Sequence, residues 1–206
     1  MVRALSNAGV VLALLACQMA PALAQAVDGR QHVTMADAPS RNAPRYLLMD
    51  AQGRAITNED FRGRFQLVTF GFVSCPDVCP TTLLQFKTLL NSLGDKAGRL
   101  QPIFITVDPE RDTREILRAY IAAFDSRIIG LTGSSELVRR AAESFRVQYE
   151  KVREPGAKPD IYTMNHTAGM FLLDPDGILL ATYSYEMPAD EISRRIGAVI
   201  AGGGFR

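Results

Sequence analysis

Apolar runs of strand length alternate with amphipathic stretches along most of this chain. A continuous apolar run predicts a strand buried on both faces, and apolar residues three and four positions apart predict a helix. A short capped turn is expected at 57–61 and an extended arm at 148–152. The pattern predicts strands at 46–50, 67–72, 103–107 and 128–131, and helices at 81–93, 113–124 and 134–145.

The C-terminal third has a different pattern. Apolar runs at 170–173 and 178–183 are separated by Asp174-Pro175-Asp176-Gly177, whose residues favour a tight turn, so a β-hairpin is predicted. A last helix is expected at about 188–200. Alternating strands and helices indicate an α/β fold whose central sheet is mixed and mostly parallel, with helices on both faces. Closure by a C-terminal hairpin plus helix is the thioredoxin-like arrangement.

The first 26 residues read as an export signal. Arg3 precedes the apolar run 10–16, and two Ala-x-Ala sites end at Ala24 and Ala26. The apolar run is too short to span a bilayer comfortably. The segment ending at Cys17 also matches a lipoprotein cleavage box, in which Cys17 would carry the lipid and anchor the protein to a membrane. The Ala-x-Ala sites fit better, so we expect a free periplasmic product.

The remaining chain suits one domain. Residues 27–45 are polar and proline-bearing, which predicts a flexible leader before a folded domain at 46–201. The glycine-rich end, 202–206, lacks the preceding strand and following helix of a phosphate-binding loop and is expected to be a flexible tail. We expect the protein to be a monomer.

Net charge and cysteine content exclude some classes of function and favour others. The formal net charge is +1, which gives no electrostatic case for nucleic-acid binding. After signal cleavage the chain keeps two cysteines, Cys75 and Cys79, too few for a disulfide-stapled scaffold. Two neighbouring thiols in an oxidising compartment are expected to have a chemical role and not only to fill space in the core. They indicate a metal site or a redox pair.

The motif Cys75-Pro76-Asp77-Val78-Cys79-Pro80 lies between a buried strand and a helix. A helix N-terminus favours negative charge, so the pKa of the thiols is expected to fall below its ordinary value. Three intervening residues place the sulfurs about one helical turn apart, a spacing that allows a disulfide or a shared metal ion. Thioredoxin-type dithiols have two intervening residues, so the longer spacing favours the metal.

One distant histidine can complete such a site. His166 directly precedes the predicted hairpin, and in a thioredoxin-type fold that loop packs beside the cysteine loop. His32 falls in the leader. Two thiolates and an imidazole favour copper, although zinc accepts the same donors. Asp77, between the thiols, and Asp108, at the end of strand 103–107, are candidates to tune the site or contact a partner.

Three segments, in this order, resemble the signatures of the Sco/SenC family over about residues 45–200: 71–81, 106–113 and 165–167. The resemblance implies a thioredoxin fold that holds copper, as Cu(I) or Cu(II), through Cys75, Cys79 and His166. It also implies delivery of copper to, or preparation of, the dinuclear copper centre of cytochrome c oxidase. The implied partners are the copper-site subunit of that oxidase or another copper chaperone.

Other readings of the same residues remain open. Some family members reduce disulfides, and in such an enzyme Cys75 or Cys79 would attack a substrate disulfide while the other thiol resolved the mixed disulfide. A peroxidase that oxidises one cysteine to sulfenic acid is a further option. The close pairing of the thiols argues against it.

Overall fold

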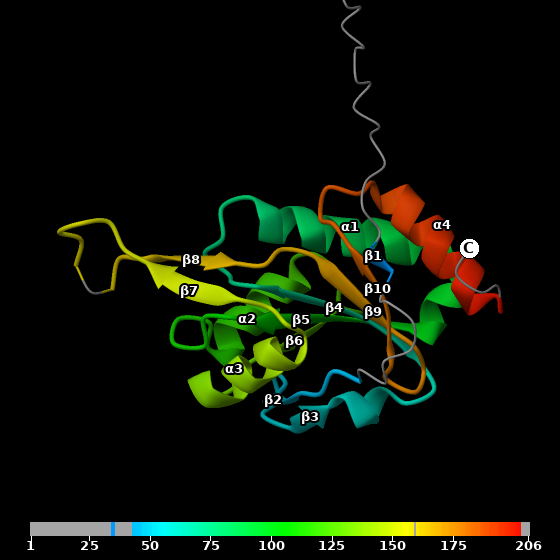
Figure 1. Ribbon diagram of the computed structural model, residues 1–206, viewed down its shortest axis with the longest axis horizontal. Coiled ribbons are helices and arrows are strands. Elements are labelled where there is room, and N and C mark those ends of the chain that lie inside the picture. The colour runs from blue at the N-terminus through cyan, green and yellow to red at the C-terminus, as the bar shows by residue number, and fades with distance from the viewer. Residues whose placement is uncertain (1–33, 36–42, 159, 203–206) are drawn as a thin grey trace, which may run out of the picture. The chain divides into compact units, whose positions relative to one another are not determined.

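A six-stranded mixed sheet organises the part of the chain that the computed structural model describes, residues 34–35, 43–158 and 160–202 (Figure 1). These residues belong to the second of the two units into which the chain divides, residues 31–206. In spatial order the strands are β1 (Thr34–Met35), β10 (Leu179–Tyr183), β9 (Met170–Leu173), β4 (Phe65–Gly71), β5 (Leu100–Thr106) and β6 (Ile129–Leu131).

Strand direction divides the sheet in two. β4, β5 and β6 are parallel, whereas β9 runs antiparallel to β4, β10 to β9 and β1 to β10. The predicted mixed sheet is therefore confirmed, but the expectation that it is mostly parallel is wrong. The reason is that the C-terminal hairpin adds both of its strands beside β4 and so contributes antiparallel pairs.

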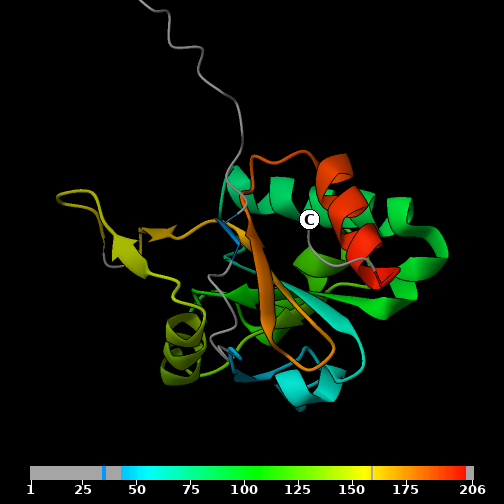
Figure 2. The ribbon, with the colours of Figure 1, turned by 45° about the vertical axis from the view of Figure 1, so that its right-hand side comes forward.

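Helices cover both faces of the sheet, as predicted. α1 and α4 pack against each other over one face, while α3 lies across the other with the hairpin of β2 (Leu47–Met49) and β3 (Ala55–Thr57) (Figures 1 and 2). Short 3-10 helices follow β3 at Asn58–Phe61 and α1 at Gly94–Arg99. The α-helices are α1 (Val78–Leu93), α2 (Arg114–Ala122), α3 (Ser135–Ser144) and α4 (Ala189–Ile200).

α1 begins at Val78, three residues before the predicted start. The motif that contains Pro80 was expected to be a loop, but a proline is tolerated in the first helical turn, because N–H groups there have no intrahelical acceptor. The earlier start places Cys79 inside the first turn of α1. Both cysteines of the motif therefore belong to one local structure, a loop that leads directly into the helix.

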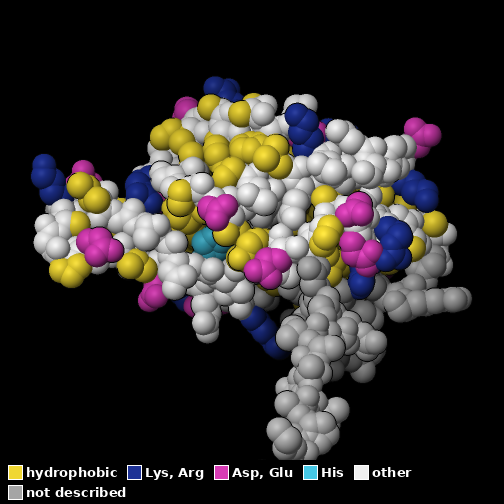
Figure 3. Space-filling view, turned by 90° about the horizontal axis from the view of Figure 1, so that it is seen from above, with side chains coloured by type: hydrophobic (Ala, Val, Ile, Leu, Met, Phe, Trp, Pro, Cys, Tyr) yellow, Lys and Arg dark blue, Asp and Glu magenta, His cyan; other side chains and the backbone are white. Residues whose placement is uncertain are grey.

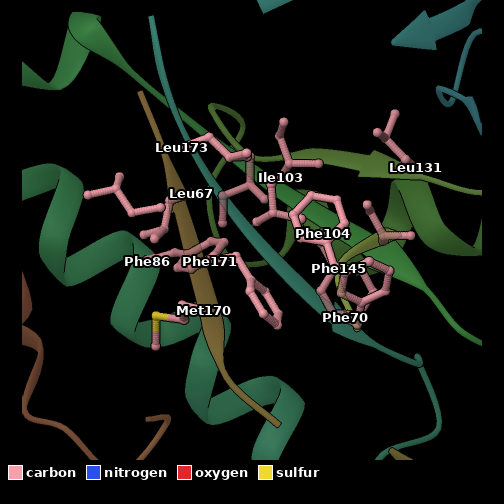
Figure 4. Close-up of a cluster of buried hydrophobic side chains, with 14 of the residues drawn as sticks. Leu67, Phe70, Phe86, Ile103, Phe104, Leu131, Phe145, Met170, Phe171 and Leu173 are labelled. Atoms are coloured by element: carbon pink, nitrogen blue, oxygen red, sulfur yellow. The ribbon is translucent and has the colours of Figure 1, made fainter. Parts of the chain in front are cut away.

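The hydrophobic core holds β4 in place (Figure 4). Every residue of β4 and β5 is buried, as expected for strands covered on both faces. Phe70, Phe145 and Phe171 form an aromatic cluster with ring centroids 5.3 to 6.2 Å apart. Because β4 is packed on both sides, its carboxyl end at Gly71, where the cysteine loop starts, has a defined position.

A two-stranded arm extends away from the sheet (Figures 1 and 2). It consists of β7 (Tyr149–Val152) and β8 (Thr163–His166), which pair antiparallel with Tyr149 opposite His166. The extended segment expected at 148–152 is thus confirmed as β7. β8 was not predicted, because its sequence Thr-Met-Asn-His is short and mostly polar.

The ends of the chain fall largely outside the described residues. The predicted signal at 1–26, with Cys17, and His32 are among those outside. Within the predicted leader, Thr34 and Met35 form β1 and pair with Thr182 and Ala181 of β10. In the described ranges, no helix combines the length and the apolar character needed to cross a bilayer.

Candidate metal centre

The cysteine loop joins the end of β4 to the start of α1. The backbone N–H of Cys75 donates to the Phe72 carbonyl oxygen at 3.2 Å, which closes a turn. The backbone N–H of Cys79 donates to the Sγ of Cys75 at 3.4 Å. Both thiols are free, and Cys75 is half-buried whereas Cys79 is only 2% exposed. An unpaired N–H of the first helical turn thus points at a sulfur, as expected for this kind of helix start.

His166 reaches this loop from the base of the arm. Its Nε2 lies 3.9 Å from the Sγ of Cys79. Its Nδ1 lies 3.1 Å from the Thr167 carbonyl oxygen. Because a carbonyl oxygen only accepts hydrogen bonds, Nδ1 carries the proton and the lone pair of Nε2 faces the thiol. The His166 ring also packs edge-on against Phe72, with centroids 6.0 Å apart.

Burial decides the protonation of both groups. It lowers the pKa of His166, so the imidazole is neutral at neutral pH and can bind a metal. Burial also raises the pKa of the Cys79 thiol, and its hydrogen bond with Cys75 acts in the same direction. The expectation of a lowered pKa is therefore wrong for Cys79. The helix N-terminus does not compensate for the loss of water around a thiol this deeply buried, although a metal that binds the sulfur would displace its proton.

Gly71 leaves the space that the Cys79 sulfur occupies. A Cβ added at Gly71 would lie 2.7 Å from the Sγ of Cys79 and 2.8 Å from the Phe104 ring. Next to it, the hydroxyl of Thr69 donates to the Gly169 carbonyl oxygen at 2.9 Å. That bond ties β4 to the segment just after His166. The centre of the sheet therefore positions the thiol and the entry to the hairpin together.

The predicted ligands are brought together in pairs. Cys79 contacts Cys75 through its backbone and His166 through its side chain. Nowhere in the described part of the chain do three or more His, Cys, Asp or Glu side chains gather closely enough to hold a metal ion. A ligand set of three therefore needs a small further movement, either of the Cys75 side chain or of the arm.

The two predicted aspartates have different surroundings. Asp77 is exposed at the N-cap position of α1, between the thiols in sequence, and its side chain makes no capping hydrogen bond. Asp108 is buried, and its carboxylate accepts a hydrogen bond from the Tyr162 hydroxyl at 2.8 Å and pairs with Arg111. Asp77 is thus exposed to solvent, whereas Asp108 is held between Tyr162 and Arg111.

A third aspartate was missed by the sequence reasoning. Asp112 is 1% exposed, and its Oδ2 accepts hydrogen bonds from the Val73 backbone N–H at 3.0 Å and the Thr106 hydroxyl at 2.6 Å. Burial raises the pKa of Asp112 although these two hydrogen bonds act to lower it. Its position within segment 106–113, which was singled out as a signature, was the available signal.

Figure 3 shows one face of the described part of the chain, on which a histidine side chain is visible among apolar side chains with acidic groups nearby. His166 is half-buried, so its imidazole remains partly accessible to solvent.

Comparison with known proteins decides the family. The SCO1/SenC family model matches residues 34–201. The chain belongs to the SCO1/SenC family. Among its relatives, human "Protein SCO2 homolog, mitochondrial" is 40% identical over 148 residues, which cover 71% of this chain and 55% of the relative. The fission yeast protein "Protein sco1" is 33% identical over 154 residues, or 74% and 59%. This SCO1/SenC chain thus spans somewhat over half the length of these relatives.

Solved structures agree with the fold of this SCO1/SenC protein. Copper-bound ScoI of Bradyrhizobium japonicum is 35% identical with a TM-score of 0.67, and the match covers 73% of this chain and 94% of that one. Apo Sco1 of Thermus thermophilus is 36% identical with a TM-score of 0.71, with 84% and 96% covered. Copper-bound yeast Sco1 is 34% identical with a TM-score of 0.64, with 74% and 86% covered. The predicted family and thioredoxin-like fold are confirmed.

Proposed function

We propose that this SCO1/SenC protein is a copper chaperone that holds one copper ion through Cys75, Cys79 and His166. The observation that carries the proposal is the 3.9 Å approach of the His166 Nε2 to the Cys79 Sγ. This approach brings a nitrogen donor beside a sulfur donor, and both are ligand types that copper accepts. Relatives solved with copper bound, such as those of Bradyrhizobium japonicum and yeast, support the same ion.

The donor chemistry fits copper. Thiolates select Cu(I), and a neutral imidazole also suits Cu(II). The hydrogen bond from Nδ1 to the Thr167 carbonyl fixes the ring orientation, as second-shell partners of metal-bound histidines usually do. Space for the Cys79 sulfur is already present beside Gly71. The site is completed when the Cys75 sulfur turns from the Cys79 N–H toward the imidazole.

Release of copper follows from the unequal burial of the ligands. Cys79 is buried, whereas Cys75 and His166 are partly exposed. An incoming donor from a partner would replace one of the exposed ligands first, and Cys75 would then take up a proton as it leaves the metal. Copper is the cargo in this scheme. It is transferred to the partner by ligand exchange, with no bond in the protein chain broken.

The proposed recipient is the dinuclear copper centre of cytochrome c oxidase, reached through its copper-site subunit or another copper chaperone. We place the protein in the periplasm because of the export signal predicted at 1–26, with attachment by a lipid on Cys17 as the alternative. Two free thiols outside the cytoplasm are exposed to oxidants that can join them in a disulfide.

A second candidate function is reduction of disulfides. It is favoured by the free thiols and by the short contact between the Cys79 N–H and the Cys75 sulfur. The half-buried Cys75 would attack a substrate disulfide as thiolate and release one substrate thiol. Cys79 would then attack the mixed disulfide, release the second substrate thiol and leave a Cys75–Cys79 disulfide.

Competitive copper titration of the purified protein separates these functions. We expect one copper ion per chain and thiolate-to-Cu(II) absorption in the wild type. Copper affinity should fall at least about tenfold in Cys75→Ser, Cys79→Ser and His166→Ala, which corresponds to about 1.4 kcal/mol per lost ligand. His32→Ala, which removes the other histidine, is the control and should keep the copper affinity of the wild type. Wild-type copper affinity in His166→Ala would refute the chaperone site, and retained reduction of insulin disulfides in that variant would favour the enzyme.

A further inference from the structure

The segment at the carboxyl end of β5, Thr106–Asp112, contacts both parts of the chain that carry ligands of the proposed copper site, the cysteine loop and the arm. It closes on itself, because the backbone N–H groups of Arg111 and Asp112 donate to the Asp108 carbonyl oxygen at 3.2 and 2.9 Å. Asp108 and Asp112 are each only 1% exposed. Their carboxylates hold different parts of the molecule. We refer to Thr106–Asp112 as the brace.

Asp112 ties the brace to the cysteine loop. Its Oδ2 accepts a hydrogen bond from the Val73 N–H at 3.0 Å, two residues before Cys75. The Thr106 hydroxyl donates to the same oxygen at 2.6 Å and accepts from the Asp108 N–H at 2.9 Å. Hydrogen bonds to a charged acceptor are among the stronger ones in proteins, and here they are buried. The backbone path into the first thiol is therefore fixed by one carboxylate.

Asp108 ties the brace to the arm. Its Oδ1 accepts a hydrogen bond from the Tyr162 hydroxyl at 2.8 Å, and its Oδ2 pairs with the Nε of Arg111. Arg111 also donates from Nη1 to the Tyr162 carbonyl oxygen at 2.8 Å. The Arg111 guanidinium lies 3.8 Å from the centroid of the Tyr162 ring, within reach of a cation–π interaction. Tyr162 directly precedes β8, which ends at His166.

The other strand of the arm is tied to the same place. The Nζ of Lys151, in β7, lies 4.9 Å from the centroid of the Tyr162 ring and pairs with Glu110 of the brace at 2.6 Å. An isolated two-stranded hairpin is marginally stable in water, so the orientation of such an arm depends on the contacts that hold it. Here the brace holds both strands toward the loop end of the β7–β8 pair, away from the end where His166 pairs with Tyr149.

We propose that the brace sets the distance between the thiols and the imidazole, with Asp112 and Tyr162 as its positioning residues. Neither side chain is a ligand in the proposed site. Each acts through the backbone that carries a ligand, Asp112 through the cysteine loop and Tyr162 through β8. The inference rests on the proposed function only for its copper readout, because the contacts themselves involve no metal.

The metal-free protein provides the first test. Tyr162→Phe removes one hydroxyl and leaves the Asp108 carboxylate one donor short. Amide hydrogen exchange at Asn165 and His166 should accelerate about fivefold, the equivalent of one hydrogen bond to the arm, while amides of β5 keep their rates. Tyr185→Phe is the matched control, since its hydroxyl contacts only Glu186 among the described contacts. Unchanged exchange in β8 would overturn the proposal.

Copper gives the second test. In Tyr162→Phe and Asp112→Asn the ligands remain, so thiolate-to-Cu(II) absorption should persist while copper dissociates about five times faster than in the wild type and in Tyr185→Phe. A lower melting temperature with an unchanged dissociation rate would show a merely structural role and refute the proposal. If His166→Ala bound copper like the wild type, the proposed copper function would be refuted. Hydrogen exchange in the metal-free protein would still test whether the brace holds the arm in place.

Discussion

The Nε2 of His166 lies 3.9 Å from the Sγ of Cys79, although 87 positions separate the two residues in the chain. Cys79 belongs to the first turn of α1 and His166 to the end of β8, so two separate elements meet at this point. The proton on Nδ1 leaves the lone pair directed at sulfur. This contact makes the histidine part of the cysteine site.

Substitution of Gly71 should disturb the buried sulfur. In Gly71→Ala the new Cβ would lie 2.7 Å from the Cys79 Sγ and 2.8 Å from the Phe104 ring, closer than real contacts allow. We expect a loss of about 1–3 kcal/mol in the free energy of unfolding, as for other overpacked cores. Urea unfolding measures it. Gly98→Ala, where a Cβ meets nothing within 4 Å, should be close to neutral, and equal stability of both variants would contradict the packing described.

The contact between α1 and the sheet should depend on Phe86. This residue is fully buried, at 0% exposure, whereas Leu84 on the same helix is 54% exposed. Phe86→Ala should cost about 3–5 kcal/mol of unfolding free energy, because it removes a large ring and leaves a cavity. Leu84→Ala should change it by less than about 0.5 kcal/mol, as is usual for surface positions. Chemical denaturation of both variants checks the pair, and a small loss in Phe86→Ala would show that α1 is not seated on the core.

Acid should remove the stabilisation that Asp50 provides. Burial of this carboxyl acts to raise its pKa, but hydrogen bonds from Arg54 and the Gln52 N–H outweigh burial and hold the pKa below its ordinary value. A lowered folded-state pKa gives stability that is present above the unfolded value and is lost as pH falls through the folded one. Asp50→Asn should therefore unfold more easily at pH 7, by about 1–3 kcal/mol.

The same variant has a characteristic pH dependence. The difference in unfolding free energy between the wild type and Asp50→Asn should shrink as the pH drops below the folded-state pKa of Asp50. Asp95→Asn, at an exposed position, is the control, and its unfolding free energy at pH 7 should lie close to that of the wild type. A difference that stayed constant from pH 7 into strong acid would rule out this account of Asp50.

The two thiols should differ in reactivity. Cys75 is half-buried, whereas Cys79 is 2% exposed and has a pKa raised by burial, so little thiolate forms there at neutral pH. Iodoacetamide should modify Cys79→Ser, which keeps Cys75, at least about tenfold faster than Cys75→Ser at pH 7.5. The rate in Cys75→Ser should continue to rise at alkaline pH. Equal rates at neutral pH would show that Cys79 is accessible.

Much of the fold follows from local patterns. Buried strands such as β4 and β5 appear as continuous apolar runs, and Thr113 and Ser134 cap α2 and α3 at the expected places. β8 was not predictable in this way, since its polar residues form a strand only because β7 pairs with them. The predicted start of α1 was three residues late, because the apolar spacing typical of a helix begins only after Thr81.

Within the site, the identity of the candidate residues was easier to predict than their environment. Cys75, Cys79 and His166 stood out because, outside the signal predicted at 1–26, the sequence has no other cysteine and one other histidine, His32. The raised pKa of Cys79 depends on how deeply the fold buries this thiol, which the local sequence around the motif does not indicate. The hydrogen bond between Asp112 and Val73 joins residues 39 positions apart and became visible only in the fold.

X-ray absorption spectroscopy at the copper edge tests the central claim most directly, because it counts the donor atoms around the metal. For the copper-loaded wild type we predict two sulfur donors and one imidazole nitrogen at each copper ion. In His166→Ala the two sulfurs should remain and the imidazole signal should disappear. An imidazole signal that persisted in His166→Ala, or a wild-type spectrum with no imidazole, would contradict the proposed ligand set.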